Sequence, residues 1–256
     1  MSFRKCLGYI LVTAAASFSF VGNANALTIA TTGDTAGEAG GIPVNQSVYS
    51  VTVDDAGDIG SSFTMNWAFN GTDNVSAAGI FTILDYDGSA TGFLNLGVEI
   101  TNTSSVTVDS NPRILSYGFN TNPDVTALTV TDDSNTDVDI FVDSALDVTF
   151  PSFQTIDVCV FAQNCTGGAV NGGLASGQTD SMILSMTGDF SSSNTFYISD
   201  FAMKFQAINS YELPGQGECT QDCGPPPEGN VPAPATLALM GIGLLGFVAT
   251  RRRRIA

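Results

Sequence analysis

The sequence predicts an all-β protein built on a single β-sandwich, and three observations support this prediction. About ten short runs rich in β-branched and aromatic residues are separated by polar turns. No central stretch repeats its apolar residues with the 3.6-residue period of a helix. No fixed-period repeat of the kind that builds propellers or solenoids is present. We therefore expect one domain of two packed sheets, with jelly-roll-like connections, across residues 27–212.

The expected strands are short and are bounded by turn signals. Phe, Val, Ile, Thr and Tyr are frequent in these runs, as expected for side chains that pack on a pleated sheet. Asp54–Gly57, Asn70–Asp73 and Asp85–Gly88 place Asp, Asn and Gly between the first strands, where turns favour them. The expected strands are residues 48–53, 62–69, 79–84, 92–100, 114–119, 125–131, 138–150, 155–161, 181–186 and 196–205.

The strand at residues 62–69 indicates which face of its sheet is buried. Side chains two residues apart share one side of an extended chain. We expect that side to face the core. A Trp67 exposed in a groove beside acidic residues would instead favour sugar binding. The burial of Trp67 therefore decides between a core position and a sugar-binding one. The residues on this side are Phe63, Met65, Trp67 and Phe69.

The composition excludes several classes of function. The 256-residue chain has no histidine, which removes Ser-His-Asp triads and histidine-ligated metal centres. Its formal charge is −17, and six of its eight basic residues lie at the two ends. Between the ends, Arg113 and Lys204 stand against 25 acidic residues, a formal charge of −23. Such a body repels nucleic acid and anionic lipid, so we expect neither as a partner.

The N-terminus has the three parts of a secretory signal peptide. Arg4 and Lys5 provide the positive charge, and an uncharged apolar run follows them. Ala24 and Ala26 then provide small residues at the positions that signal peptidase reads. We expect cleavage after Ala26, which makes residues 1–26 the signal peptide. An uncleaved anchor helix is the alternative, although the apolar run is short for a bilayer span.

The C-terminus combines a proline motif, an apolar helix and an arginine cluster. Residues 213–230 are rich in Cys, Pro and Gly and are expected to form a linker. Residues 236–250 are apolar, and as a helix they reach about 22 Å, less than the hydrocarbon core of about 30 Å. The arginines that follow favour an orientation with the body outside the cytoplasm. The motif residues are Val231, Pro232, Ala233 and Pro234, and the cluster residues are Arg251, Arg252, Arg253 and Arg254.

Residues 231–256 resemble the PEP-CTERM sorting signal of Gram-negative bacteria. In that signal a Pro-Glu-Pro-like motif precedes a short transmembrane helix and a terminal arginine cluster, and here Ala233 replaces the usual Glu. The resemblance implies recognition by exosortase and cleavage near Pro232 and Pro234. It also implies an inner-membrane intermediate followed by transfer to the cell surface or extracellular matrix. An ordinary tail anchor that is never cut is the alternative.

The body is similar to a second group, the cistern family of PEP-CTERM proteins. The similarity depends on residues 62–73, 157–168 and 172–177, and it covers roughly residues 45–210. That family brings no assigned activity with it. The resemblance therefore implies a domain and says nothing of a mechanism.

The cysteines suit an exported protein. Four of them remain once the signal peptide is removed, an even number, as expected where disulfides form. Cys159 and Cys165 lie six residues apart, which predicts one local disulfide. Cys219 and Cys223 lie four residues apart, which predicts a second. A four-thiolate zinc site is the alternative, although these spacings suit zinc poorly.

One acidic segment is a candidate calcium site. Carboxylate and amide oxygens at short spacing are the hard ligands that Ca²⁺ prefers. The segment lacks the glycine and the distal glutamate of an EF-hand, so a solvated acidic turn is the alternative. Asp54, Asp55 and Asp58 form a weaker second candidate. The ligands expected in the first segment are Asp132, Asp133, Asn135, Asp137 and Asp139.

Paired carboxylates are the remaining candidates for catalysis. A glycoside hydrolase needs two of them, about 5–9.5 Å apart. Asp85 and Asp87 would point the same way in an extended segment, but 25 acidic residues produce such pairs by chance, and a turn is the simpler interpretation.

We expect no enzyme activity and no required cofactor. The predicted function is an exported structural or adhesive protein of the exopolysaccharide or biofilm matrix; a secreted carbohydrate-binding module or carboxylate-dependent glycoside hydrolase is the alternative.

Overall fold

A computed structural model describes most of the body of this chain. Within the described part the chain forms fourteen β-strands and two short 3-10 helices, η1 (Ala56–Asp58) and η2 (Val170–Gly172). No helix in that part is long and apolar enough to cross a membrane. The expected signal peptide (1–26) and the expected transmembrane helix (236–250) lie outside it. The described residues are 27–39, 42–54, 56–71, 73–107, 110–133, 136–150, 153–192 and 195–219.

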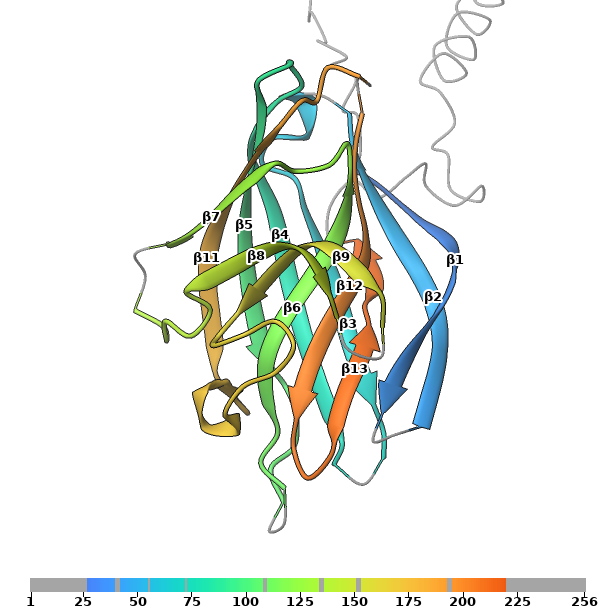
Figure 1. Cartoon of the computed structure of the whole chain (residues 1–256), viewed down its shortest axis with the longest axis vertical. Coiled ribbons are helices and arrows are strands. Elements are labelled where there is room, and N and C mark those ends of the chain that lie inside the picture. The colour runs from blue at the N-terminus through green and yellow to red at the C-terminus, as the bar shows by residue number, and fades with distance from the viewer. Residues whose placement is uncertain are drawn as a thin grey trace, which may run out of the picture.

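Two antiparallel sheets form the β-sandwich that the sequence predicts (Figure 1). In the larger sheet neighbouring strands follow the order β13 (Ser210–Pro214), β1 (Thr28–Ala39), β2 (Ile42–Val53), β12 (Phe196–Gln206), β6 (Arg113–Asn122), β9 (Thr155–Phe161) and β8 (Asp143–Thr149). In addition, β10 (Leu174–Ala175) pairs with β6, and β13 pairs with β12 as well as with β1. In the smaller sheet they follow the order β14 (Gln216–Cys219), β3 (Ser62–Phe69), β4 (Val75–Asp87), β5 (Gly92–Asn102), β11 (Thr179–Gly188) and β7 (Ala127–Asp132).

The core lies between the sheets and follows the alternation of strand residues. On β3, Phe63, Met65 and Trp67 are at most 1% exposed, which confirms the predicted core face. Phe69 is partly buried and packs against the same core. The Phe63 ring lies 5.7 Å from the ring of Phe201 on β12, measured between centroids. Aromatic contacts therefore join the two sheets at the centre of the molecule.

Most expected strands are present, and the expected strand at 138–150 is shorter than predicted. β3 and β9 begin and end at the predicted residues. β8, by contrast, begins only at Asp143. The chain before it stays irregular because the backbone amides of Ile140 and Phe141 donate to the Asp180 carboxylate, at 2.8 and 2.6 Å. The Asp180 side chain thus accepts backbone hydrogen bonds that a neighbouring strand would otherwise accept.

β1 was not among the predicted strands. It pairs with β2 along its whole length, from Thr28 opposite Thr52 to Ala39 opposite Ile42, with a bulge between Thr31 and Gly33. Its residues are mostly Thr, Gly and Ala, which give no alternation of apolar and polar positions. Long-range pairing with β2 decides its conformation.

The body extends beyond residue 212, where we expected it to end. β13 continues to Pro214, and β14 pairs with β3 in the other sheet, so the predicted linker at 213–230 is wrong for residues 213–219. Gly215 makes the crossing between the sheets. A Cβ atom there would lie 2.9 Å from the Cβ of Phe201 and 3.1 Å from Nε1 of Trp67. Only glycine lets the chain pass this close to the core, which is why a residue typical of linkers lies inside the fold.

Candidate functional site

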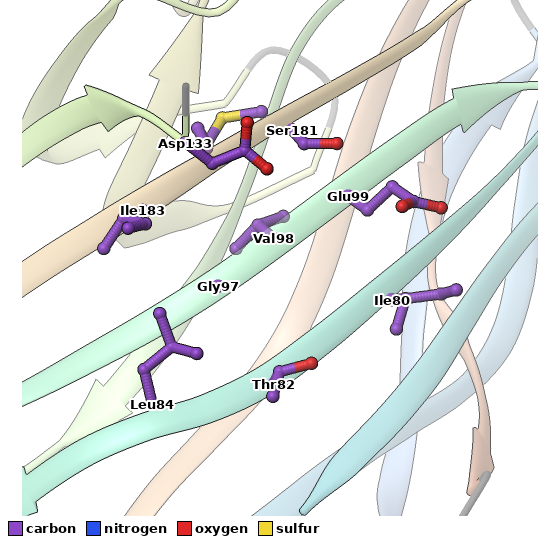
Figure 2. Close-up of a pocket in the computed structure, with 10 residues that line it drawn as sticks. Ile80, Thr82, Leu84, Gly97, Val98, Glu99, Asp133, Ser181 and Ile183 are labelled. Carbon is purple, nitrogen blue, oxygen red and sulfur yellow. The ribbon is translucent and has the colours of Figure 1, made fainter. Parts of the chain in front are cut away.

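The outer face of the smaller sheet carries an open groove of about 340 Å³ (Figure 2). β4, β5 and β11 form its floor. Gly97 on β5 lies in register between Thr82 on one side and Ile183 on the other. Because Gly97 has no side chain, the floor is low at this position, and the Leu84 side chain lies beside the gap. The groove is therefore hollowed at a glycine and lined by aliphatic side chains.

The rim of the groove is acidic. Glu99 is exposed and lies in register between Ile80 on β4 and Ser181 on β11. Asp133, directly after β7, lines the groove from the far side of β11 (Figure 2). Ile80 and Leu84 are 40% and 41% exposed, which is high for large aliphatic side chains. The groove thus places two carboxylates beside an exposed apolar surface.

A cluster of three carboxylates lies next to the groove. One oxygen from each of Asp137, Asp139 and Asp180 lies within 4.8 Å of the others. Asp180, on β11, is 2% exposed and accepts the two backbone hydrogen bonds from Ile140 and Phe141. A small cavity of about 70 Å³ adjoins the cluster and is lined in part by Asp139 and Asp180. A cation here would find three hard oxygen ligands.

Burial changes the titration of Asp180. Loss of hydration raises its pKa from 3.8 to about 6, opposed in part by the two backbone hydrogen bonds and assisted by the charges of Asp137 and Asp139. The charged form of Asp180 is therefore costly in this cluster. A bound cation would reduce that cost.

The structure brings together only part of the predicted calcium segment. Asp137 and Asp139 lie together, whereas Asp132 is exposed at the end of β7 and Asp133 lines the groove. Asn135 lies outside the described residues. Sequence reasoning missed Asp180, because it is far from the segment along the chain. Its position directly before the expected strand at residues 181–186 was the one signal that could have singled it out.

The other acidic candidates make local bonds within the described residues. Oδ2 of Asp58 accepts a hydrogen bond from the backbone N–H of Asp54 at 2.7 Å, as in a turn, and Asp55 lies outside the described part. At the end of β4, Asp85 accepts from the N–H of the next residue, and Asp87 accepts from the N–H of Ser89 at 3.0 Å. The Asp58 contact agrees with the turn interpretation, whereas Asp85 and Asp87 lie within β4, opposite Asn95 and Phe93 of β5, so the turn expected to begin at Asp85 is wrong for these two residues.

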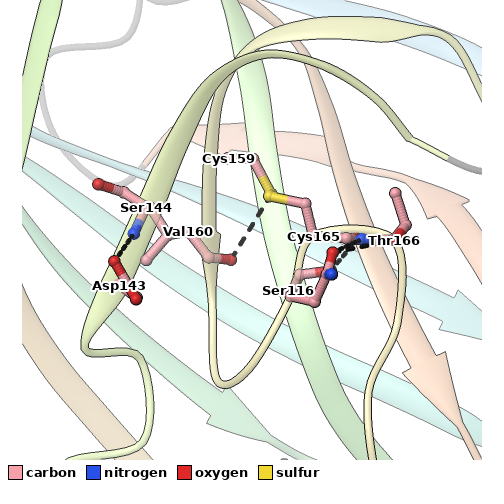
Figure 3. Close-up of a disulfide and its surroundings, with 8 residues drawn as sticks. Ser116, Asp143, Ser144, Cys159, Val160, Cys165 and Thr166 are labelled. Carbon is pink, nitrogen blue, oxygen red and sulfur yellow. Dashed lines mark hydrogen bonds between the residues drawn. A yellow bond between two sulfur atoms is a disulfide. The ribbon is translucent and has the colours of Figure 1, made fainter.

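The predicted disulfide Cys159–Cys165 is present, with Cα atoms 6.2 Å apart (Figure 3). Cys159 alternates along β9 with the core residues Val158 and Val160, so its side chain lies on the outer face of the larger sheet. The hydroxyl of Ser116 donates to the carbonyl of Cys165 at 3.0 Å. The cysteine loop is therefore held against that face. The second predicted disulfide involves Cys223, which lies outside the described residues.

A second cluster of buried residues covers the same outer face. It is separate from the main core and includes the disulfide. Half-buried side chains, among them Val148 and Phe153, pack around it. The outer face of the larger sheet is thus covered by the chain itself over this area. The buried members of the cluster are Phe150, Ile156, Cys159, Cys165 and Ala202.

The two body cations are both engaged. Lys204 and Glu212 lie opposite each other on β12 and β13 and form a buried ion pair, at 5% and 2% exposure. The Ser210 hydroxyl bridges them, accepting from Nζ of Lys204 at 3.0 Å and donating to Glu212 at 3.1 Å. Arg113 is half-buried and donates to the carbonyl of Gly173 at 3.1 Å. The ion pair was not predicted from the sequence.

Comparison with known proteins identifies the C-terminal segment. Residues 230–254 match the PEP-CTERM protein-sorting motif. This is an exosortase sorting signal. The PEP-CTERM motif implies an exported protein that exosortase processes, with a membrane-anchored intermediate before surface display. No curated protein and no solved structure matches the chain.

The residues of the sorting signal lie outside the described part of the structure, as do Ala24 and Ala26 of the predicted signal-peptidase site. The motif match and the predicted signal at 231–256 overlap almost completely.

Proposed function

We propose that the protein is an exported component of the cell surface or extracellular matrix of a Gram-negative bacterium, with a structural or adhesive role in exopolysaccharide or biofilm. The sorting motif at residues 230–254 carries this proposal, because exosortase substrates leave the membrane for the cell exterior. A β-sandwich closed by a disulfide suits an oxidising, extracellular setting. We assign no catalytic residue, and we propose that the protein is not an enzyme.

Two finer assignments belong to this proposal. Among the described strands, the chain changes from one sheet to the other after β2, β5, β6, β7, β10, β11 and β13, and these repeated crossings support a jelly roll. The resemblance of residues 45–210 to the cistern family is a further prediction. The alternative of a sugar-binding module that uses an exposed aromatic loses its main candidate, because Trp67 is 1% exposed.

The termini of the surface protein test the proposal. The intact gene is expressed in its native host, and the protein extracted from the surface is examined by mass spectrometry. We expect signal peptidase to leave Leu27 as the first residue and exosortase to remove Arg251–Arg254. An uncut tail on the wild-type protein, in a host that contains exosortase, would overturn the proposal.

Substitution of the motif prolines separates recognition from membrane insertion. Pro232→Ala with Pro234→Ala leaves the apolar helix unchanged, so the precursor should insert but accumulate in the inner membrane with its arginines intact. The matched control is Pro225→Ala with Pro226→Ala, the same change in the linker outside the motif. A plain tail anchor predicts that both variants behave like the wild type.

Replacing the arginine cluster tests the anchor itself. With Arg251–Arg254 changed to Ser, the short apolar helix loses the cytoplasmic charges that help to hold it. That variant should leak into the medium at full length. Retention in the membrane would show that the helix needs no charged anchor.

Calcium binding at Asp137, Asp139 and Asp180 is a second proposal. The observation that favours it is the convergence of the three carboxylates, one of them almost fully buried. Ca²⁺ takes six to eight oxygen ligands, so backbone carbonyls and water would complete the shell. The alternative is an acidic loop without a bound ion.

Melting curves decide between these two states of the acidic cluster. A ligand that binds only the folded protein raises the melting temperature, so millimolar calcium should raise it relative to chelator. Asp139→Asn should remove this shift. Asp143→Asn, an exposed acid on the larger sheet, should keep it. Identical melting of the wild type in calcium and in chelator would leave only the ion-free loop.

A further inference from the structure

We propose that the outer face of the larger sheet binds a neutral polysaccharide at a tyrosine platform, formed by Thr52, Asn120, Asn122, Tyr197 and Asp200. The platform extends over β2, β12 and β6, which lie side by side in that sheet (Figure 1). The inference rests on the proposed matrix role, and it names the surface that holds the matrix polymer and the charge class of that polymer.

Tyr197 is the one exposed aromatic residue among the side chains that the structure describes, at 39%. Its neighbours on β12, Phe196 and Ile198, are fully buried in the main core. Because side chains alternate along a strand, the Tyr197 ring lies on the outer face of the sheet. It is not part of the buried cluster around Phe150 that covers another area of this face. An exposed aromatic ring gains free energy when the apolar face of a sugar covers it.

Polar side chains of two neighbouring strands lie beside the ring. Tyr197 is opposite Thr52 on β2 and opposite Asn122 on β6. Two residues further along β12, Ser199 is opposite Asn120. Hydroxyl and amide groups both donate and accept hydrogen bonds, as the hydroxyls of a sugar do. The ring is therefore bordered by groups that pair with sugar hydroxyls in either direction.

A bulge in β12 adds a carboxylate to the same face. The register shifts between Ser199 and Ala202, and Asp200 has a φ of +53°, a left-handed conformation uncommon for residues other than glycine. In a regular strand Asp200 would face away from Ser199. Instead its Oδ2 accepts hydrogen bonds from Nδ2 of Asn120 at 2.9 Å and from the Ser199 hydroxyl at 3.3 Å. The bulge thus directs Asp200 toward the platform, a use of bulges that is common beside functional sites.

The charges of this surface favour a neutral ligand. Asp200 already accepts hydrogen bonds from Asn120 and Ser199, and the nearby Asp157 accepts one from the backbone N–H of Thr121 at 2.7 Å. Both carboxylates therefore have donors within the protein and require no cation from a ligand. The body has a formal charge of −23, so an anionic polymer would be repelled. A neutral polymer meets neither difficulty.

The backbone at the platform favours a polysaccharide over an added peptide strand. Along Tyr197–Ser199, β12 pairs with β2 on one side and with β6 on the other. A peptide that extends a sheet needs an unpaired strand edge, and the centre of the platform offers none. Recognition here depends on side chains: an aromatic ring bordered by hydroxyl, amide and carboxylate groups.

The test uses full-length protein purified in detergent and polysaccharide extracted from the matrix of the native host, separated by anion exchange into a neutral and an anionic fraction. The neutral fraction should bind, and the anionic fraction should not. Tyr197→Ala should weaken binding by about tenfold, because exposed aromatic anchors carry much of the affinity of a binding surface. Tyr197→Phe keeps the ring and should retain most of the affinity. Asn122→Ala, on the neighbouring strand, should also weaken binding.

The matched control is Leu84→Ala, which removes a large side chain of nearly equal exposure, 41%, from the smaller sheet and should leave affinity unchanged. The melting temperature reports whether each variant keeps its fold. Equal weakening by Tyr197→Ala and Leu84→Ala would mean unspecific apolar adsorption and would overturn the platform. Full binding by Tyr197→Ala, preference for the anionic fraction, or no binding by the wild type would overturn it too. Any of these results with a correctly cut tail leaves the proposed export intact, whereas an uncut tail defeats the proposed function whatever the polysaccharide does.

Discussion

The two outer faces of the sandwich differ in how far the chain itself covers them. On the larger sheet, the cluster around Phe150 and the Cys159–Cys165 disulfide closes the surface, and Lys204 and Glu212 are buried beside it. On the smaller sheet, Ile80 and Leu84 stay exposed around a groove. One face is therefore closed by buried residues, and the other leaves large aliphatic side chains exposed.

This difference predicts that substitutions on the two outer faces differ in their cost to stability. Residues on the covered face should be costly to change, because they are buried with specific partners. Residues on the open face should be less costly to change, because their side chains are partly exposed. Four changes test the contrast.

The largest effect is expected at the buried ion pair. Lys204→Met leaves the carboxylate of Glu212 buried without its partner, which should lower the free energy of unfolding by about 3–5 kcal/mol. Urea denaturation of the protein measures this loss. The double variant Lys204→Met with Glu212→Leu should recover most of it, because no charge is then buried. A small cost for the single change would mean that the covered face is open to water.

The next effect is a pH dependence at Asp180, measured in chelator. Its pKa is raised from 3.8 to about 6, so the folded state binds the proton more tightly than the unfolded state does. The stability that Asp180 itself contributes is therefore fully present below pH 4, is lost as the pH rises from about 4 to about 6, and is level above that. The loss amounts to about 3 kcal/mol. Asp180→Asn is the reference, since the amide oxygen keeps an acceptor for Ile140 and Phe141. If the free energy of unfolding changed with pH in the same way for the wild type and for Asp180→Asn, the raised pKa of Asp180 would be contradicted.

Removal of the disulfide should cost less. Cys159→Ser with Cys165→Ser opens a short loop, and the chain-entropy model gives about 2 kcal/mol for a loop of this size. Thermal unfolding of the variant and of the wild type, both without reductant, checks the value. A variant as stable as the wild type would show that packing around Phe150 holds the loop without the bond.

The smallest effect is expected on the open face. Leu84→Ser should lower the free energy of unfolding by about 1 kcal/mol, because the side chain is already 41% exposed in the folded state. Leu96→Ala, on the buried face of the neighbouring strand, should cost about 2–5 kcal/mol. If the two variants melt alike, the contrast between the faces of the smaller sheet is wrong.

Local pattern was enough to predict strands whose alternation is strong. β3 and β9 carry apolar residues at regular positions, and both match their predicted bounds. β1 has no such pattern, and its pairing with β2 and β13 makes it a strand. The crossing at Gly215 could not be foreseen either, because its reason is the distance to Trp67 and Phe201, which depends on the tertiary fold.

The candidate site shows the same limit. The acidic segment was visible because Asp137 and Asp139 lie two residues apart in a run of polar residues. Asp180 joins them from β11, and no local signal links the two segments. The groove depends on register across three strands, which places Gly97 beside Thr82 and Ile183. Sequence patterns relate residues that are close along the chain, whereas these sites join residues that are far apart in the sequence and close in space.

The direction of β14 has a mechanical consequence. β14 runs antiparallel to β3, and its last residue, Cys219, lies opposite Phe63, near the start of that strand. The tail that anchors the membrane intermediate follows Cys219 along the chain. A pull on the tail along the axis of β14 therefore loads the hydrogen bonds to β3 in shear, all at once. Bonds loaded in this way break together, whereas bonds pulled apart from one end open in sequence.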